Sequence, residues 1–524
     1  MFLVLSKLLH RKLLFLTLSG FVLVTACQKV EEKRSMQVLK INLQEGDLPS
    51  LHPHDVLVYL RGISASKMLF EGLTRINERG KICLAGAQSL EISQDRLHYS
   101  FILRDNCWSD GTPVTAYQYE QGFKEALSPN SRCMQSNLLY MIKNGERAKK
   151  GEVALDQIGV KALDEKRLEI ELEYPSPYLA ELLAQPICAP LIDGEKKPTR
   201  FNGPFYVDRW ESDHLIQLKP NPHFWNRKEV KLEQVDFVMI PDPNVAFEAY
   251  KKGEIDWLGS PLSPLSREQV QILKEELRQH PIDRSFWIYL NTDHPHLASQ
   301  NIRQALSLAL SRSIVTEHIL LGGDPLGKVL SPNLFPINLS IIPKEDLIEA
   351  QKRFAEGLQE LGYTKETFPP LTISYAQQAN RKEFAQYLQE TWSRAFGIKV
   401  QLQQQEWNVL RANLSKGIFD VCAAFEAAYY GDPLEILERV GRKSPTNFSQ
   451  WVNDDYRKLI SAAILTDDTQ GRLEILGKAE KLLLEELPFI PVCSDRLFFV
   501  HRDGLGGYTF DSLGAIDLSY ASFR

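Results

Sequence analysis

The sequence predicts a mixed α/β fold spread over several domains. Segments with the two-residue period of β-strands alternate with amphipathic helices, in both hairpin-like and crossover order. The chain has 524 residues, which corresponds to about three domains at roughly 150 residues each. Its hydrophobic content of 44% and charged content of 24% are ordinary for a globular protein. This composition excludes a disordered chain, a collagen-like chain and a polytopic membrane protein.

Three segments in the first third of the chain show the alternation of a half-buried strand. Leu39, Ile41 and Leu43 alternate with polar residues, and the same pattern recurs over residues 97–103 and 168–172. Because successive side chains of a strand point to opposite faces, each segment can bury one face and expose the other. We therefore predict strands at these three places.

Capping residues mark the boundaries of the predicted helices. Thr115 followed by Gln118 predicts a capping box at the start of one helix. The Asp-Pro dipeptide at 242–243 predicts a second start, and Gly253 predicts its end. A long amphipathic helix is predicted over residues 384–396, with a strand directly after it.

The first 26 residues are typical of a bacterial secretory signal. Three basic residues precede a 12-residue apolar run over positions 13–24. This run is shorter than the about 20 residues that a membrane-spanning helix needs. We therefore predict a signal peptide over residues 1–26.

Residues 24–27, Val-Thr-Ala-Cys, resemble a bacterial lipobox, whose cysteine is acylated and becomes the new N-terminus. We expect lipidation of Cys27 and a lipid-anchored polar tether over residues 27–36. The protein would then be periplasmic or at the cell surface, bound to a bacterial membrane. The alternative is a plain signal peptide cut near Ala26, which leaves Cys27 unmodified.

The charge and the cysteine content argue against further classes of protein. The 61 basic and 67 acidic residues give a net charge of −6, so no positive excess is available to bind a nucleic acid backbone. Outside Cys27 no two cysteines form a CxxC pair, which argues against a zinc knuckle or a thioredoxin motif. In an oxidising compartment up to three disulfides can form, and the spacing leaves their pairing open among Cys83, Cys107, Cys133, Cys188, Cys422 and Cys493.

Candidate metal and catalytic motifs are weak. His52 with His54, and His294 with His296, are the two His-x-His pairs. Both contain proline and are typical of loops, so we predict surface histidines rather than a metal site. The GxxxxGK at 322–328 lacks the Ser or Thr that follows it in a phosphate loop, and the sequence contains neither HExxH nor GxSxG. We predict no cofactor, no metal and no enzyme activity.

A series of short segments carries the strongest functional signal. The most specific is residues 102–116, ILRDNCWSDGTPVTA, and residues 158–182 form the next block. Further segments lie at 69–73 (LFEGL), 202–205, 218–226, 253–256, 301–313, 405–407 and 417–420. In this order, and over nearly the whole chain, they resemble the oligopeptide-binding (OppA-like) family, family 5 of the bacterial extracellular solute-binding proteins.

This resemblance implies a two-lobed periplasmic-binding-protein fold (type II, peptide-binding class) with an extra third domain. The ligand would lie between two lobes that close around a hinge. The implied boundaries are lobe I at 37–70, 199–283 and 500–524, the extra domain at 71–198, and lobe II at 284–499.

The resemblance also implies a function. We expect the extracytoplasmic substrate-binding component of an ABC peptide importer, a monomer that captures short peptides and delivers them to a membrane permease. Main-chain pairing with an extended ligand would allow broad specificity. The alternatives are a receptor of the same fold for a metal chelate, haem or modified sugar, and a scaffold, adhesin or chaperone that has lost transport.

One segment departs from the family pattern. Common members carry Ala-Asp-Tyr late in the chain, and that aspartate pairs with the α-amine of the peptide; here Tyr429 takes its place. A phenol cannot neutralise an ammonium at pH 7. We hypothesise that Glu426 or Asp432 supplies the charge, the alternative being that both are structural or solvent-facing. If the clamp is lost, cell-wall peptides with a blocked amine become candidate ligands.

Other positions are assigned by the same resemblance. Tyr140 resembles a cleft-contacting tyrosine, Trp407 matches a family tryptophan, and Tyr289 stands where relatives place a cleft glutamate. Core packing is the alternative role for Tyr140 and Trp407. The expected ligand-binding residues are Tyr140, Tyr289, Trp407, Glu426, Tyr429, Tyr430 and Asp432.

Overall fold

The structure, a computed structural model, describes residues 37–524 except 45, 57–59, 78, 321, 336–343, 378 and 467. The predicted signal peptide, the lipidation residue Cys27 and the tether up to residue 36 lie outside the described residues. In the part of the chain that is described, no helix is long and apolar enough to cross a membrane.

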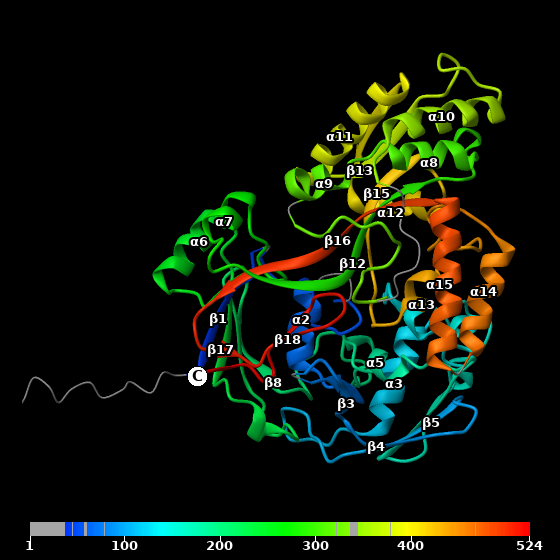
Figure 1. Cartoon of the computed structure of the whole chain (residues 1–524). Coiled ribbons are helices and arrows are strands. Elements are labelled where there is room, and N and C mark those ends of the chain that lie inside the picture. Colours follow the sequence, from blue (N-terminus) through cyan, green and yellow to red (C-terminus); the bar gives the residue numbers. More distant parts are fainter. Residues whose placement is uncertain are drawn as a thin grey trace, which may run out of the picture. The chain divides into compact units, whose positions relative to one another are not determined.

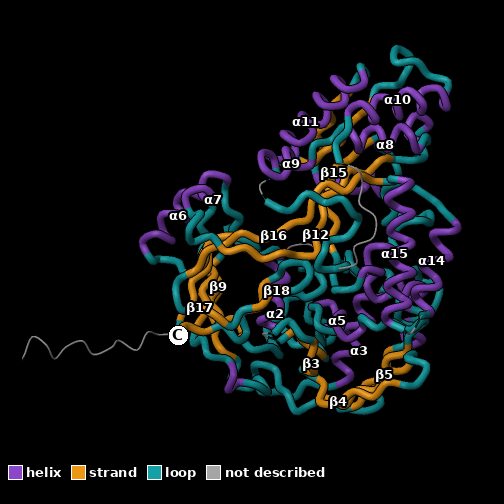
Figure 2. Tube along the Cα trace, in the orientation of Figure 1, coloured by secondary structure: helices purple, strands orange, loops and turns teal. Residues whose placement is uncertain are grey.

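A ten-stranded mixed sheet, ordered β14-β13-β15-β12-β16-β11-β1-β10-β9-β8, is the main framework (Figures 1 and 2). Its two longest strands, β12 (Arg278–Leu290) and β16 (Phe489–His501), pair antiparallel in the middle of this order. Figure 1 shows them side by side in green and red. The other strands are β14 (Val400–Gln405), β13 (Leu371–Ala376), β15 (Val421–Ala427), β11 (Trp257–Gly259), β1 (Val38–Asn42), β10 (Gln234–Val238), β9 (Leu215–Pro220) and β8 (Phe205–Glu211).

A second, four-stranded antiparallel sheet has the order β4-β5-β7-β6. Its strands are β4 (Ala87–Ile92), β5 (His98–Leu103), β6 (Val160–Ala162) and β7 (Arg167–Glu171). With β1, strands β5 and β7 confirm the three strands predicted from alternation. Short two-stranded pairs are β2 (Thr74–Ile76) with β3 (Ile82–Leu84), β17 (Leu505–Gly506) with β20 (Ser522–Phe523), and β18 (Thr509–Phe510) with β19 (Ile516–Asp517).

The predicted helices are present and end where the capping residues indicate. Helix α3 (Ala116–Leu127) begins where the Thr115 amide donates to Gln118 Oε1 at 2.9 Å. Gly253, with φ of 81°, ends α6 (Pro243–Lys252), and Gly397, with φ of 71°, follows α11 (Ala379–Phe396). Further helices are α2 (Leu60–Leu69), α4 (Gly145–Lys149), α5 (Leu179–Leu182), α7 (Arg267–Ile272), α8 (Gln300–Leu308), α9 (Arg312–Ile314), α10 (Leu347–Leu361), α12 (Trp407–Ser415), α13 (Pro433–Leu437), α14 (Asp454–Leu465) and α15 (Thr469–Glu486).

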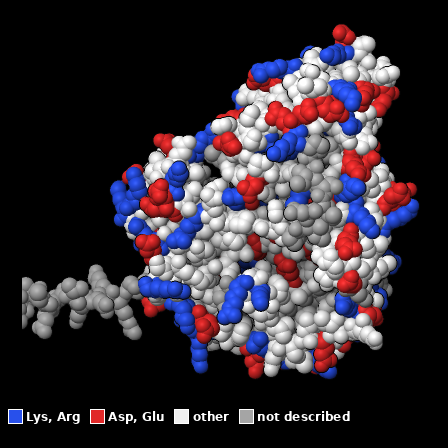
Figure 3. Space-filling model, in the orientation of Figure 1, with Lys and Arg blue, Asp and Glu red and all other residues white. Residues whose placement is uncertain are grey.

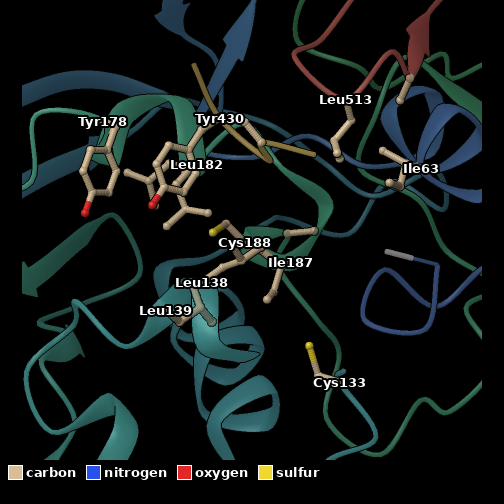
Figure 4. Close-up of a cluster of buried hydrophobic side chains, with 14 of the residues drawn as sticks. Ile63, Cys133, Leu138, Leu139, Tyr178, Leu182, Ile187, Cys188, Tyr430 and Leu513 are labelled. Carbon is tan, nitrogen blue, oxygen red and sulfur yellow. The ribbon is translucent and has the colours of Figure 1, made fainter. Parts of the chain in front are cut away.

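Buried apolar side chains from distant stretches of the chain pack together. Figure 4 shows Leu138, Tyr178, Cys188 and Tyr430 in one such cluster. Cys107, Cys133, Cys188, Cys422 and Cys493 form no disulfide with one another. On the outside, Lys and Arg are interspersed with Asp and Glu over the face drawn in Figure 3. The alternation of strands and helices confirms the predicted mixed α/β class.

Candidate functional site

A cavity of about 570 Å³ is lined by two stretches that are far apart in sequence, residues 134–174 and residues 411–464. It combines aromatic and apolar side chains with charges of both signs. The charged residues of its wall are Glu146, Arg411, Glu435, Glu438, Arg439, Arg442 and Arg457. Apolar walls with a few charged groups are typical of ligand pockets, so this cavity is the candidate site.

Arg439 lines this cavity and holds two glutamates, Glu435 at the wall and Glu426 behind it. Its Nη1 donates to Glu426 Oε2 at 2.6 Å, and its Nη2 donates to Glu435 Oε1 and to the Ala427 carbonyl. Behind it, the Tyr289 hydroxyl on β12 donates to Glu426 Oε1 on the neighbouring strand β15. Glu426 is therefore fully occupied by a guanidinium and a phenol.

The charges of this network depend on its burial. Although burial disfavours the charged guanidinium, the Glu435 and Glu426 carboxylates raise the pKa of Arg439. Burial raises the pKa of Tyr289 well above its usual range, so its hydroxyl stays a neutral donor. Burial also raises the pKa of Glu435, and raises that of Glu438 to about 7.

Three charged side chains of the wall have no ion partner. Within the described residues, no oppositely charged atom lies within 4 Å of the charged atoms of Arg411, Arg442 or Glu438. Arg442 is still near enough to oppose the rise in the pKa of Glu438. The cavity thus presents two cations and one acid that are available to a ligand carrying both charges.

Asp432 has a different environment from the one expected. It caps α13 by accepting from the Leu434 amide at 2.8 Å. Both of its oxygens also accept from Arg472, at 2.8 and 2.7 Å, and only 9% of the residue is exposed. Such a bidentate pair is among the strong hydrogen-bonded contacts in proteins. Its role as a ligand carboxylate stays a prediction.

Tyr430 lines the cavity and packs against residues that follow the first stretch. Its ring stacks on Tyr178 with centroids 4.4 Å apart and planes 12° apart (Figure 4). Next to it, Gln185 Nε2 donates to the Tyr429 carbonyl at 3.1 Å, and the Gly431 amide donates to Glu181 Oε1 at 2.7 Å. Residues 429–431 are therefore fixed against α5 and its flanks.

The structure brings some of the expected ligand-binding residues to the cavity and leaves others away from it. Tyr140 and Tyr430 line it, and Tyr289 and Glu426 lie behind it through Arg439. Trp407 begins α12, is 47% exposed and does not line the cavity, so its role stays a prediction.

The role of Tyr429 as a ligand-binding residue also stays a prediction, because Tyr429 does not line the cavity. It is partly buried, and burial raises its pKa to about 12.

Sequence reasoning missed the charged residues that surround the cavity. One signal was available, because Glu435 with Arg439 and Glu438 with Arg442 have the i,i+4 spacing of helical ion pairs. Only the first of these pairs forms an ion contact. The contribution of Arg411 comes from a separate helix, α12, and no local spacing indicates it.

The prediction that the His-x-His pairs are surface histidines is wrong for three of the four residues. His52, His54 and His296 are only 6%, 3% and 7% exposed. Their loops lie against other elements: His52 and His54 contact Glu125 on α3, and His296 contacts Phe368.

Comparison with known proteins decides the family. The family model described as bacterial extracellular solute-binding proteins, family 5 Middle, matches residues 83–448. The chain belongs to this family. Oligopeptide-binding protein OppA of Bacillus subtilis (strain 168) is 31% identical over 514 residues, which is 94% of each chain. Periplasmic murein peptide-binding protein MppA of Escherichia coli (strain K12) is 27% identical over 453 residues, 83% of this chain and 84% of that protein.

A solved structure supports the same assignment. The Escherichia coli murein tripeptide binding protein MppA superposes with a TM-score of 0.79 at 25% identity, over 93% of this chain and 99% of that chain. The predicted fold class, the type II periplasmic-binding-protein fold of family 5, is thereby confirmed. Members of family 5 are extracytoplasmic binding proteins. The family 5 match covers the wall of the cavity except for residues of α14. The lobe and domain boundaries stay predictions.

Proposed function

We propose that this family 5 protein is the extracytoplasmic substrate-binding component of an ABC peptide importer. It captures short peptides in the 570 Å³ cavity and delivers them to a membrane permease. The cavity is lined by the predicted extra domain at 71–198 and the predicted lobe II at 284–499, whereas the resemblance implies a ligand between lobe I and lobe II. The protein changes no bond in its ligand. The names of its relatives support this function, because one is an oligopeptide-binding protein and another a murein peptide-binding protein.

The observation that carries the proposal is the charge of the cavity. A short peptide has an ammonium at one end and a carboxylate at the other, and an unpaired buried charge costs several kcal/mol. Arg411 and Arg442 are available for the carboxylate and Glu438 for the ammonium. The volume of about 570 Å³ lies in the usual range for small ligands, about 300–1,000 Å³, which favours peptides of few residues.

Glu438 offers a simpler amine partner than Glu426 or Asp432. To bind an ammonium, Glu426 would have to release Arg439, and Asp432 would have to release Arg472. Glu438 has no such partner among the described residues. We infer that Glu438 binds the ligand amine. The earlier hypothesis, that Glu426 or Asp432 binds it, is tested below with variants of all three residues.

The membrane anchor belongs to the proposal as well. Acylation of Cys27 would hold the protein at a bacterial membrane on the tether at residues 27–36. The soluble part would then work as a monomer beside the permease.

The test measures the melting temperature of the protein with di- to hexapeptides that have free or acetylated N-termini and free or amidated C-termini. A ligand at 100 times its dissociation constant stabilises a protein by about 2.7 kcal/mol, an observable shift. We expect a shift with peptides that have both ends free, and a smaller one when either end is blocked. A shift with none of the peptides would contradict the proposal and favour a non-peptide solute or a role without transport.

The amine partner is tested by the same shift in three variants: Glu438→Gln, Glu426→Gln and Asp432→Asn. We expect only Glu438→Gln to remove the preference for a free amine over an acetylated one. Loss of that preference in Glu426→Gln or Asp432→Asn, with Glu438→Gln unchanged, would assign the amine to the hypothesised residues instead.

A further inference from the structure

Two buried histidines and one carboxylate converge beside a second cavity. His52 and His54 come from the loop before α2, and Glu125 comes from the last turn of α3. The distance from Glu125 Oε1 is 3.2 Å to His52 Nε2 and 3.5 Å to His54 Nδ1. The three side chains line a cavity of about 430 Å³, together with Asp55, Ser131, Arg132, Cys133 and Lys196 among others.

His54 is the observation that points to a ligand. Its side chain is only 2% exposed. Within the part of the chain that the structure describes, neither its Nδ1 nor its Nε2 makes a hydrogen bond of acceptable geometry. A buried polar group without a partner costs free energy, and a bound ion or water would supply that partner. Its Nδ1 faces the Glu125 carboxylate at short range, but the contact is not aligned as a hydrogen bond.

The distances fit a metal ion placed between these atoms. A tetrahedral ion with bonds of about 2.0–2.1 Å to nitrogen and oxygen holds its ligand atoms about 3.4 Å apart. The two contacts of Glu125 Oε1, at 3.2 and 3.5 Å, are close to this spacing. The adjoining cavity leaves room for a fourth ligand such as water and for entry of the ion.

The chemistry of the three side chains also suits a metal, because metals bind carboxylates and neutral imidazoles. Binding of the ion through His52 Nε2 would place the ring proton on Nδ1, so the long bond of 3.4 Å that Nδ1 accepts from the His54 amide would be lost.

We propose that His52, His54 and Glu125 form a binding site for a divalent transition-metal ion of the zinc type. Two imidazoles with a carboxylate are typical zinc ligands, whereas calcium and magnesium prefer oxygen ligands. The ion would link the loop at residues 50–55, which belongs to the predicted lobe I, to α3, which belongs to the predicted extra domain. This site shares no lining residue with the peptide cavity.

A second set, His294, His296 and Asp420, serves as the matched control. Its ligand atoms also lie near one another, but the contact between His294 and Asp420 is 3.4 Å and leaves His294 part-exposed. The other carboxylate oxygen of Asp420 already accepts from the Thr372 amide at 2.9 Å. A measurement on both sets shows which of them holds the ion.

The test titrates the purified, metal-free protein with Zn²⁺ in competition with a chromophoric chelator, and counts the bound zinc after dialysis. We expect a tight site in the wild type and in His294→Ala. We expect at least about tenfold weaker binding at this site in His54→Ala and in Glu125→Gln. Because Glu125→Gln keeps the shape of the side chain, we expect it to fold even if His54→Ala does not, and circular dichroism checks both variants.

Three results would overturn the proposal. The first is the absence of zinc binding by the wild type. The second is an affinity that remains unchanged in Glu125→Gln and His54→Ala. The third is loss of the tight site in His294→Ala alone, which would assign the ion to the control set.

Discussion

The two walls of the peptide cavity differ in charge. The wall from residues 134–174 is made of Met134, Asn137, Leu138, Tyr140, Met141 and Tyr174, with Glu146 as its single charged residue. The wall from residues 411–464 carries four arginines and two glutamates. We infer that the two walls have different roles. The first can contact many ligand side chains without selecting among them, and the second can recognise the charged ends of a peptide.

The charged wall itself contains two kinds of residue. Arg439 is used by the protein, since it holds Glu426 and Glu435. Arg411 and Arg442 make no such contact with other described residues. Substitutions on the charged wall should therefore affect either stability or ligand affinity, depending on which kind is changed.

The largest effect is expected from Arg439→Met. It leaves two buried carboxylates without their cation, and breaking a buried ion pair typically costs about 3–5 kcal/mol of unfolding free energy. Urea unfolding measures this loss. The control is Arg457→Met on the same wall, whose partner Asp454 is exposed, as Arg457 itself is; we expect a loss of under about 1 kcal/mol. Equal, small losses in both variants would show that the network around Arg439 is not structural.

Glu438→Gln should change how stability depends on pH. Burial raises the pKa of Glu438 from 4.5 to about 7, so between these values the folded state binds more protons than the unfolded chain. Stability from protonated Glu438 is present at low pH and is lost as the pH rises through about 7. The variant should exceed the wild type by about 1–3 kcal/mol at pH 8, and this difference should shrink towards pH 5. Unfolding curves at the two pH values that show a constant difference would contradict this assignment.

A smaller effect, on affinity, is expected from the double variant Arg411→Met, Arg442→Met. Hydrogen bonds to charged groups contribute about 1.5–3 kcal/mol, so binding of a peptide with a free carboxylate should weaken about 10- to 100-fold. The amidated form of the same peptide should bind both proteins about equally. Isothermal titration provides both affinities. If the amidated peptide loses as much affinity as the free acid, the arginines do not recognise the carboxylate.

The smallest effect is expected from Tyr140→Phe on the nearly uncharged wall. Loss of one neutral hydrogen bond typically costs about 0.5–1.5 kcal/mol, which limits the loss of peptide affinity to about tenfold. The loss should be similar for peptides with free and blocked ends, because this wall does not recognise them. A strong dependence on the end groups would show that Tyr140 takes part in recognising the charged ends of the peptide.

Much of the fold could be predicted because its signals are local. Alternation of apolar residues located β1, β5 and β7, and capping residues located the ends of α3 and α6. Each of these depends on neighbours within a few positions. The ordered series of family segments supplied the fold class, which local signals alone could not.

The site was harder to predict because its contacts are not local. The sequence drew attention to Glu426 and Asp432, but not to their partners Arg439 and Arg472, which lie 13 and 40 positions further along the chain. The burial of His52 and His54 depends on α3 packing over a proline-containing loop, and the loop sequence gives no sign of it.

Peptide binding is tested most directly by identifying the ligand that the protein carries. The protein is purified from its native compartment without denaturant and then unfolded, and the released small molecules are identified by mass spectrometry. We expect short peptides with a free carboxylate, in up to equimolar amount with the protein. Release of a metal chelate, haem or sugar in place of a peptide would contradict the proposed function.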